Sequence, residues 1–140
     1  MKNQMGEVKV KVKIINATDE GLARRGQLPK DQIRFKEIEA VVDTGATTSV
    51  LPREIADNLG LDVVRQEQAH YANGYGEKVD IAETVVFEIL GRRCPEEPFI
   101  LGDEVLIGQI PLERMDLVVD CKNQEVTPNP KHPDGLTLRV

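Results

Sequence analysis

The chain has 140 residues, of which 40% are hydrophobic and 4% aromatic, and its formal net charge at pH 7 is -6. This length suits one domain spanning residues 1–140, and a negative chain without a dense lysine or arginine block excludes a nucleic-acid partner. No apolar run approaches membrane-spanning length, and residues 1–7 lack the apolar core of a signal peptide, so we expect a soluble cytoplasmic protein with no membrane partner.

The cysteines and histidines argue against a metal centre. Cys94 and Cys121 are far apart and form no Cys-x-x-Cys pair, and His70 and His132 are not spaced as metal ligands. We therefore expect no metal site and two reduced thiols, with Cys94 in a polar turn and Cys121 at the end of an apolar strand.

The chain begins with a predicted strand and a predicted loop. Residues 7–16 alternate between apolar side chains and lysines, which indicates a strand with one solvent face. Residues 17–31 are polar and contain glycine and proline, which indicates a long hairpin loop. The pair Arg24-Arg25 within it is either a cleavage or docking point or a solvated loop tip.

Residues 33–51 contain the motif that says most about function. Strand character at residues 33–42 leads directly into Asp43-Thr44-Gly45, and after a few small polar residues an apolar pair follows at 50–51. This order predicts a strand, a tight turn that holds one carboxylate, and a return strand.

A short helix and a long hairpin are predicted next. Residues 52–60 begin with proline and end with glycine, which is typical of a helix bounded by those residues. Residues 63–89 are two extended arms around a tip at 73–76, where Asn-Gly favours positive φ at both positions. Alone, this pattern also fits an ordinary surface hairpin, and Tyr71 and Tyr75 either line a cleft or cap the hairpin.

The C-terminal half contains shorter apolar segments. We expect a strand pair at residues 85–90 and 98–101, joined by a connector at 91–97, and then a Val-Leu-Ile-Gly stretch at 105–108. The remaining predicted elements are a helical turn at 111–115, a buried strand at 117–119, a stiff proline-rich connector at 127–135 and an alternating tail at 136–140.

Three of these pieces together resemble the retropepsin-like (retroviral-type) aspartic proteases. They are Val-Val-Asp-Thr-Gly-Ala at 41–46, the glycine-tipped hairpin at 71–76 and Val-Leu-Ile-Gly at 105–108, in the order found in that family. The resemblance covers most of residues 41–120. It implies an all-β acid protease fold, with a closed, β-barrel-like sheet, one or two short helices and a flap hairpin at about residues 66–84.

The same resemblance implies a homodimeric aspartic endopeptidase that acts on a peptide or protein substrate without a cofactor. The reaction needs two carboxylates around one water, and the chain has a single Asp-Thr-Gly, so each subunit would contribute one Asp43. In such enzymes Thr44 interlocks with its symmetry mate, and Gly45 offers its carbonyl to the substrate. The further substrate-binding positions that the resemblance implies are Ala46, Thr47, Gly74, Tyr75 and Gly76.

The chain departs from the family pattern near the motif. Retroviral enzymes usually have an ion pair of aspartate and arginine where this chain has Thr47 and Gln109, which suggests that a neutral hydrogen bond replaces the pair. Ala46 stands where many pepsin-like enzymes have a serine whose hydroxyl stabilises the ionised carboxylate. We therefore expect a weakly acidic pH optimum and not a strongly acidic one.

The alternative is a catalytically silent module of the same fold that serves dimerisation or peptide binding. The intact Asp43-Thr44-Gly45 motif and the glycine-tipped hairpin favour the enzyme. A third interpretation, Asp43 as a phospho-acceptor, lacks the additional acidic and lysine motifs that such enzymes carry.

Overall fold

The computed structural model describes residues 7–70 and 72–135. Within them the strands are β1 (Val8–Asn16), β2 (Phe35–Val42), β3 (Val50–Leu51), β4 (Val63–His70), β5 (Gly76–Ala82), β6 (Val85–Ile89), β7 (Arg92–Glu96), β8 (Phe99–Ile100), β9 (Leu106–Ile107), β10 (Leu117–Asp120) and β11 (Glu125–Pro128). The helices of this part of the chain are α1 (Ala17–Arg24), α2 (Arg53–Asn58) and α3 (Gln109–Arg114), with a 3₁₀ turn η1 (Lys30–Gln32).

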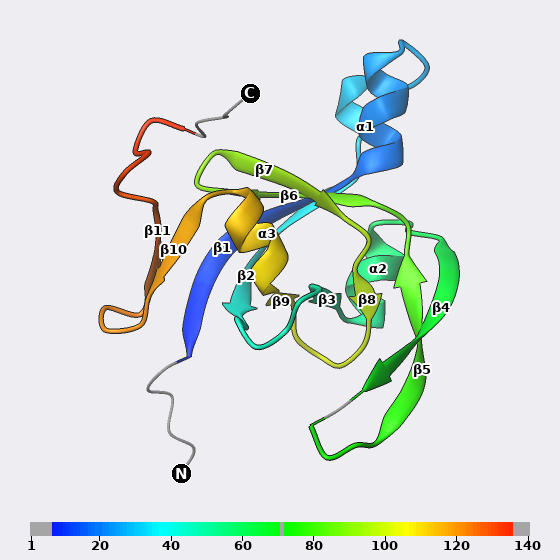
Figure 1. The fold of residues 1–140 in the computed structure, drawn as a ribbon. Helices are drawn as coiled ribbons and strands as arrows, with labels where there is room; N and C mark the ends of the chain where they lie inside the picture. Colours follow the sequence, from blue (N-terminus) through cyan, green and yellow to red (C-terminus); the bar gives the residue numbers. More distant parts are fainter. Residues whose placement is uncertain (1–6, 71, 136–140) are drawn as a thin grey trace, which may run out of the picture.

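The main sheet has the strand order β4-β5-β8-β3-β9-β2-β1-β6-β7, and β10 pairs with β11 in a separate two-stranded sheet. Figure 1 shows the main sheet curling around the core, with the β4–β5 hairpin projecting from the body of the molecule. The chain is thus mostly β, as predicted, and it has one short helix more than the one or two predicted.

The strand β9 lies between β2 and β3. It runs parallel to β2, with Val41 opposite Leu106 and Val42 opposite Ile107, and antiparallel to β3. The segment that joins β2 to β3 must therefore pass over the end of β9. As a result, the residues that follow β9 contact the turn that follows β2, although they are far apart in sequence.

The first strand has the predicted period of two. It pairs with both β2 and β6. Val8, Val12 and Ile14 are at most 2% exposed, whereas Lys9 and Lys11 are exposed. A strand with one buried face and one lysine-rich face follows directly from this alternation.

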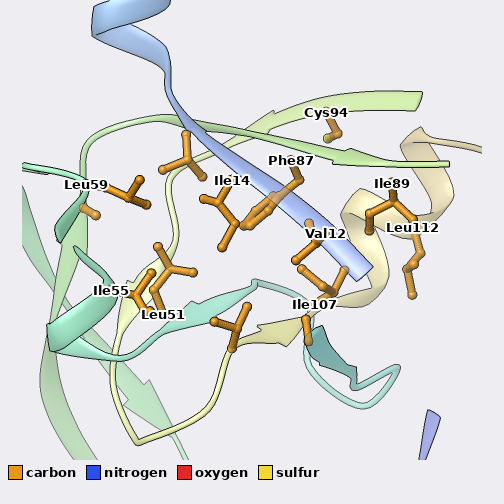
Figure 2. Close-up of a cluster of buried hydrophobic side chains, with 14 of the residues drawn as sticks. Val12, Ile14, Leu51, Ile55, Leu59, Phe87, Ile89, Cys94, Ile107 and Leu112 are labelled. Atoms are coloured by element: carbon orange, nitrogen blue, oxygen red, sulfur yellow. The ribbon is translucent and has the colours of Figure 1, made fainter. Parts of the chain in front are cut away.

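Mostly aliphatic side chains from the sheet and from the helices α2 and α3, together with Phe87 of β6, form the core (Figure 2). The two helices confirm those predicted near Pro52 and Pro111, and Ile55 and Leu59 of the α2 region are buried. Since protein interiors are close-packed, these contacts fix both helices against the sheet. None of the helices in the described ranges is both long enough and apolar enough to span a membrane.

The segment 17–31 is not the loop that the sequence predicted, because it contains helix α1. Asn16 caps the helix: its Oδ1 accepts the Asp19 N–H at 3.0 Å, and Asp19 and Glu20 lie in the first turn, where the helix dipole favours acidic groups. The prediction was wrong because it gave Gly21 and the polar composition more weight than this cap.

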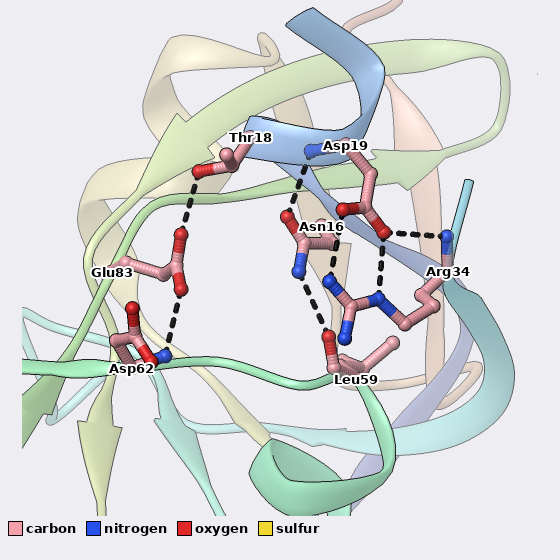
Figure 3. Close-up of polar contacts among 7 residues, drawn as sticks. All are labelled: Asn16, Thr18, Asp19, Arg34, Leu59, Asp62 and Glu83. Atoms are coloured by element: carbon pink, nitrogen blue, oxygen red, sulfur yellow. Dashed lines mark hydrogen bonds and ion pairs between the residues drawn. The ribbon is translucent and has the colours of Figure 1, made fainter. Parts of the chain in front are cut away.

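Tertiary contacts hold α1 in place (Figure 3). The carboxylate of Asp19, which is 5% exposed, accepts hydrogen bonds from the Arg34 backbone N–H at 3.0 Å, from Nε at 2.7 Å and from Nη2 at 2.9 Å. The hydrogen bonds from Arg34 lower the pKa of Asp19 from its ordinary value. Asn16 Nδ2 donates to the Leu59 carbonyl at 2.8 Å, so the start of α1 is bound both to Arg34, which precedes β2, and to the end of α2.

The predicted connector at residues 91–97 contains strand β7 (Arg92–Glu96). Leu90 and Gly91, with φ of 53° and 79°, make a two-residue turn that pairs β6 with β7, while β8 pairs with β3 and β5. Cys94 therefore lies in a strand and is 2% exposed, which corrects its predicted place in a polar turn. Burial raises the pKa of its thiol.

The C-terminal strands differ in part from the prediction. The predicted strand at 117–119 is present as β10, and Cys121 follows its end, as expected. The side chain of Cys121 is exposed. Residues 127–128 belong to β11 and not to a connector, because β11 pairs with β10 along its whole length. The predicted tail at 136–140 lies outside the described residues.

Candidate active site

The Asp43 turn directly follows β2. The Asp43 N–H donates to the Ile107 carbonyl of β9 at 2.9 Å, and the Asp43 carbonyl accepts the Ala46 N–H at 3.1 Å. The Gly45 N–H donates to Asp43 Oδ1 at 3.0 Å. Thr44 and Gly45 are exposed and the Asp43 side chain is half-buried, so a carboxylate fixed by its own turn faces the surface.

The start of α3 supports the other side of this turn. The Gln109 N–H donates to the Ala46 carbonyl at 2.7 Å, and the Ile110 N–H donates to the Thr47 carbonyl at 3.4 Å. Gly108, which precedes them, has no space for a side chain: a Cβ there would lie 2.8 Å from the Thr47 carbonyl oxygen. The missing side chain of this glycine thus allows the start of α3 to approach the Asp43 turn closely.

Gly108→Ala is expected to lower the free energy of unfolding by about 1–3 kcal/mol, because the added methyl meets backbone atoms that cannot rotate away. Urea denaturation measures the effect. Gly21→Ala is the matched control, since its Cβ would lie 3.6 Å from the end of the Arg24 side chain, and we expect it to be neutral or stabilising by up to about 1 kcal/mol. Equal effects of the two substitutions would contradict the close contact.

The Gln109 side chain does not make the predicted neutral hydrogen bond with Thr47. Its Nε2 donates to Glu113 Oε1 at 2.9 Å, one helical turn further along α3. The turn is held to α3 through backbone groups instead. An exposed i,i+4 partner on the same helix is available without further ordering of the chain, which explains why the Gln109 side chain bonds there.

The residues predicted to form a flap, about 66–84, lie mainly in the β4–β5 hairpin, whose arms are Val63–His70 and Gly76–Ala82. The second arm ends at Ala82 and not near residue 89, because β6 turns back to pair with β1. In β4 every residue except Ala69 is exposed, whereas Ile81 of β5 is fully buried. One arm is therefore anchored on the sheet, and the other is an edge strand in solvent.

The hairpin tip differs from the predicted turn in one respect. Gly74 has φ of 84°, but Asn73 is not among the residues with positive φ, and its Oδ1 accepts the Tyr75 N–H at 2.8 Å. Tyr75 is 61% exposed. Gly76 lies close to the opposite arm, since a Cβ there would be 3.0 Å from the Ala69 carbonyl oxygen. Tyr71, whose role was left open, lies outside the described residues.

The base of the hairpin is tied to helix α1 (Figure 3). Glu83, just after β5, accepts the Asp62 N–H at 2.7 Å through one carboxylate oxygen and the Thr18 hydroxyl at 2.6 Å through the other. The Glu83 N–H in turn donates to the Asp62 carbonyl at 2.8 Å. These bonds fix the point from which the hairpin projects.

No sequence motif indicated two further residues, which connect to the Asp43 turn through Gly108. Ser49 is fully buried, and its Oγ accepts the Gly108 N–H at 3.0 Å. Glu96 of β7 accepts the Ser49 N–H at 3.2 Å across 47 positions of sequence. Among residues 7–70 and 72–135, no group of three or more His, Cys, Asp or Glu side chains is placed to hold a metal ion.

The family of the protein follows from comparison with known sequences. Residues 30–114 match the family model described as gag-polyprotein putative aspartyl protease. This segment is more than half of the chain and contains the Asp43 turn, the β4–β5 hairpin and Gly108. The chain belongs to this aspartyl protease family.

Membership of the aspartyl protease family, together with the curled, strand-rich sheet, confirms the predicted retropepsin-like fold. Among solved structures, the solution structure of the Simian Foamy Virus (mac) protease is similar, at 15% identity and a TM-score of 0.48. The match covers 75% of this chain and 91% of that chain. No curated protein matches the sequence.

Proposed function

We propose that the protein is a homodimeric aspartic endopeptidase that hydrolyses peptide bonds with water activated by two Asp43 carboxylates, one from each subunit. The observation that carries the proposal is the Asp43 turn. It presents a half-buried carboxylate, oriented by the Gly45 N–H and backed by β9, within the segment that matches the protease family. Peptides and proteins of the cytoplasm are the proposed substrates.

Two such carboxylates a few ångströms apart cannot both ionise at low cost, so the pair would share one proton. The ionised member takes a proton from the water between them, while the protonated member donates a hydrogen bond to the scissile carbonyl. The water attacks the carbonyl carbon and gives a tetrahedral intermediate, which collapses as the leaving nitrogen is protonated. No covalent bond to the enzyme forms in this scheme.

The surrounding residues have roles in this proposal. Thr44, exposed at the tip of the turn, would interlock with its copy in the partner subunit, and the Gly45 carbonyl would accept a hydrogen bond from the substrate backbone. Ala46 and Thr47 would line the bound peptide. The tip of the β4–β5 hairpin, Gly74 to Gly76, would cover that peptide and exclude bulk water.

The dimer is tested by measuring mass in solution together with activity. Sedimentation equilibrium is expected to give twice the chain mass of 15.6 kDa at concentrations at which an unfolded protein substrate is cleaved. A statine-type peptide, which mimics the tetrahedral intermediate, is expected to inhibit the cleavage. A dimer that cleaves nothing between about pH 3 and pH 8 would favour the silent dimerisation or peptide-binding module.

The pH optimum is expected to be weakly acidic, above about pH 4. Ala46 has no hydroxyl that could donate to the ionised carboxylate, so the ionised form of the pair lacks one source of stabilisation. Ala46→Ser is expected to move the acid limb of the kcat/KM profile to lower pH. A wild-type optimum near pH 2, or no shift in the serine variant, would contradict this explanation.

A further inference from the structure

Ser49 lies between the Asp43 turn and β3, and its polar groups are all engaged. Its carbonyl accepts the Phe99 N–H at 3.0 Å, its N–H donates to Glu96 Oε1 at 3.2 Å, and its Oγ accepts the Gly108 N–H at 3.0 Å. The residue is fully buried. The segment from Glu96 to Phe99 therefore holds Ser49 from two directions.

The Glu96 carboxylate accepts the Ser49 N–H at 3.2 Å, while the Ser49 Oγ accepts the Gly108 N–H at 3.0 Å. The buried Ser49 therefore joins the Glu96 carboxylate to the Gly108 amide. Hydrogen bonds to an ionised acceptor are about twice as strong as those between neutral groups.

Backbone contacts connect the Gly108 amide, which Ser49 holds, to Asp43. Gly108 directly follows Ile107, whose carbonyl accepts the Asp43 N–H at 2.9 Å. A Cβ added at Gly108 would lie 2.8 Å from the Thr47 carbonyl oxygen and 2.9 Å from the Thr48 carbonyl carbon, so the backbone of the Asp43 turn leaves no free space beside Gly108. A displacement of Gly108 therefore disturbs both sides of this turn. Ser49 is the side chain that holds the Gly108 amide.

The charge of Glu96 depends on its surroundings. Burial raises the pKa of Glu96 from its ordinary value, while the hydrogen bonds from Ser49 and the positive charge of Arg114 on α3 act in the opposite direction. On its own strand, the neighbouring ionisable group is the Cys94 thiol. The carboxyl therefore gains its proton at a higher pH than an exposed glutamate does.

We propose that Glu96 is a positioning residue for Asp43, which acts through Ser49 and the Gly108 amide and does so fully only when its carboxylate is ionised. When Glu96 is protonated it offers a weaker acceptor to Ser49, and the Asp43 turn loses part of its support. The structural link is a property of the fold, and only its effect on turnover rests on the proposed function.

The effect of Glu96 ionisation on Ser49 and Gly108 is tested first by NMR, which does not require the protein to be catalytically active. In the wild type the amide signals of Ser49 and Gly108 are expected to titrate with one common midpoint above the ordinary glutamate value of 4.5. Glu96→Gln should abolish that titration. Glu88→Gln, on the adjacent strand and with 36% of the carboxylate side chain exposed, is the matched control and should leave it intact. A titration that persists in Glu96→Gln, or its absence in the wild type, would overturn the proposal.

The effect on turnover is then measured. At neutral pH, Glu96→Gln is expected to lower kcat about five- to twentyfold with KM changed less than about twofold, because geometry and not substrate contact is altered. The difference should disappear below the Glu96 midpoint, where the wild type is also neutral. Against a Ser49→Ala background, Glu96→Gln should have no further effect on kcat. A loss of kcat that is the same at every pH would reject the positioning role.

We do not expect Glu96→Gln to unfold the protein, so a loss of activity in this variant would not reflect misfolding. A carboxyl whose folded pKa is raised costs stability as pH rises through that pKa, so the neutral Glu96→Gln protein should be as stable as the wild type at neutral pH, or more stable. A wild type that cleaves no peptide would refute the proposed function, while the amide titration would still decide whether Glu96 supports the Asp43 turn.

Discussion

Asp43→Asn is expected to lower the rate of peptide-bond hydrolysis by roughly a thousandfold, since an amide can neither take a proton from water nor share one with its partner. The fold should be unaffected. Asparagine has the same shape, and its Oδ1 can still accept the Gly45 N–H that now bonds Asp43 Oδ1 at 3.0 Å. Cleavage of an unfolded protein, followed by electrophoresis or mass spectrometry, measures the loss.

Mixing the variant with the wild type tests whether two subunits form one site. With about nine Asp43→Asn subunits for each wild-type subunit, only about a tenth of the wild-type subunits would pair with a second wild-type subunit. Activity per wild-type subunit should therefore fall about tenfold after the subunits exchange. Unchanged activity would mean that each chain carries a complete site, and the shared-carboxylate mechanism would have to be abandoned.

An inactive variant must also be a folded dimer for this result to count. We expect Asp43→Asn to have the wild-type sedimentation mass and thermal stability. Thr48→Ser is a suitable control in the same turn, because it keeps a hydroxyl and alters no hydrogen bond described above. Equal cleavage by wild type and Asp43→Asn would assign the activity to a contaminating protease and favour the silent module.

The largest expected effect on stability is that of Arg92→Ala. Arg92 is 8% exposed, and its guanidinium donates to the carbonyls of Met115 at 3.1 Å, Asp116 at 2.8 Å and His132 at 2.6 Å. Its removal takes the guanidinium donor from all three carbonyls, although those of Asp116 and His132 keep the N–H groups of Asn129 and Gly135, and it empties a buried site. We therefore expect a loss of about 3–4 kcal/mol in the free energy of unfolding. Urea denaturation followed by circular dichroism measures it.

Arg93→Ala is the matched control for Arg92→Ala. Arg93 is the next residue on β7, but 46% of its side chain is exposed and it pairs with Glu20 and Glu88 at the surface. Such pairs contribute at most about 1 kcal/mol. Arg92→Lys should recover only part of the loss, because an ammonium group cannot reach carbonyls in three directions at once. Similar losses in the free energy of unfolding for Arg92→Ala and Arg93→Ala would show that the burial of Arg92 does not determine its contribution to stability.

The regular elements could be predicted where a local pattern repeats. Alternation in β1, proline and glycine at the ends of α2, and the Asn-Gly tip of the hairpin each report on a few neighbouring residues. The prediction failed where the stabilising partner is distant. Helix α1 depends on Arg34, and β7 is a strand because its backbone pairs with β6, although its sequence Arg-Arg-Cys-Pro-Glu is typical of a loop.

For the candidate site, the sequence by itself determined the identity of the central group and its immediate turn. Asp43, Thr44 and Gly45 are contiguous, so the bond from the Gly45 N–H to the carboxylate is a local property of the chain. The hairpin tip is local for the same reason. Both features depend on backbone preferences of adjacent residues and need no knowledge of the rest of the fold.

Only the tertiary structure decided what surrounds the turn. The insertion of β9 between β2 and β3 brings Gly108 against the Asp43 segment, and the β6–β7 hairpin places Glu96 beside Ser49. These contacts join residues 47 to 64 positions apart, and their strength depends on burial and charge after the chain has folded. A sequence does not show whether a carboxylate is buried or exposed, because that depends on the packing of the folded chain around it.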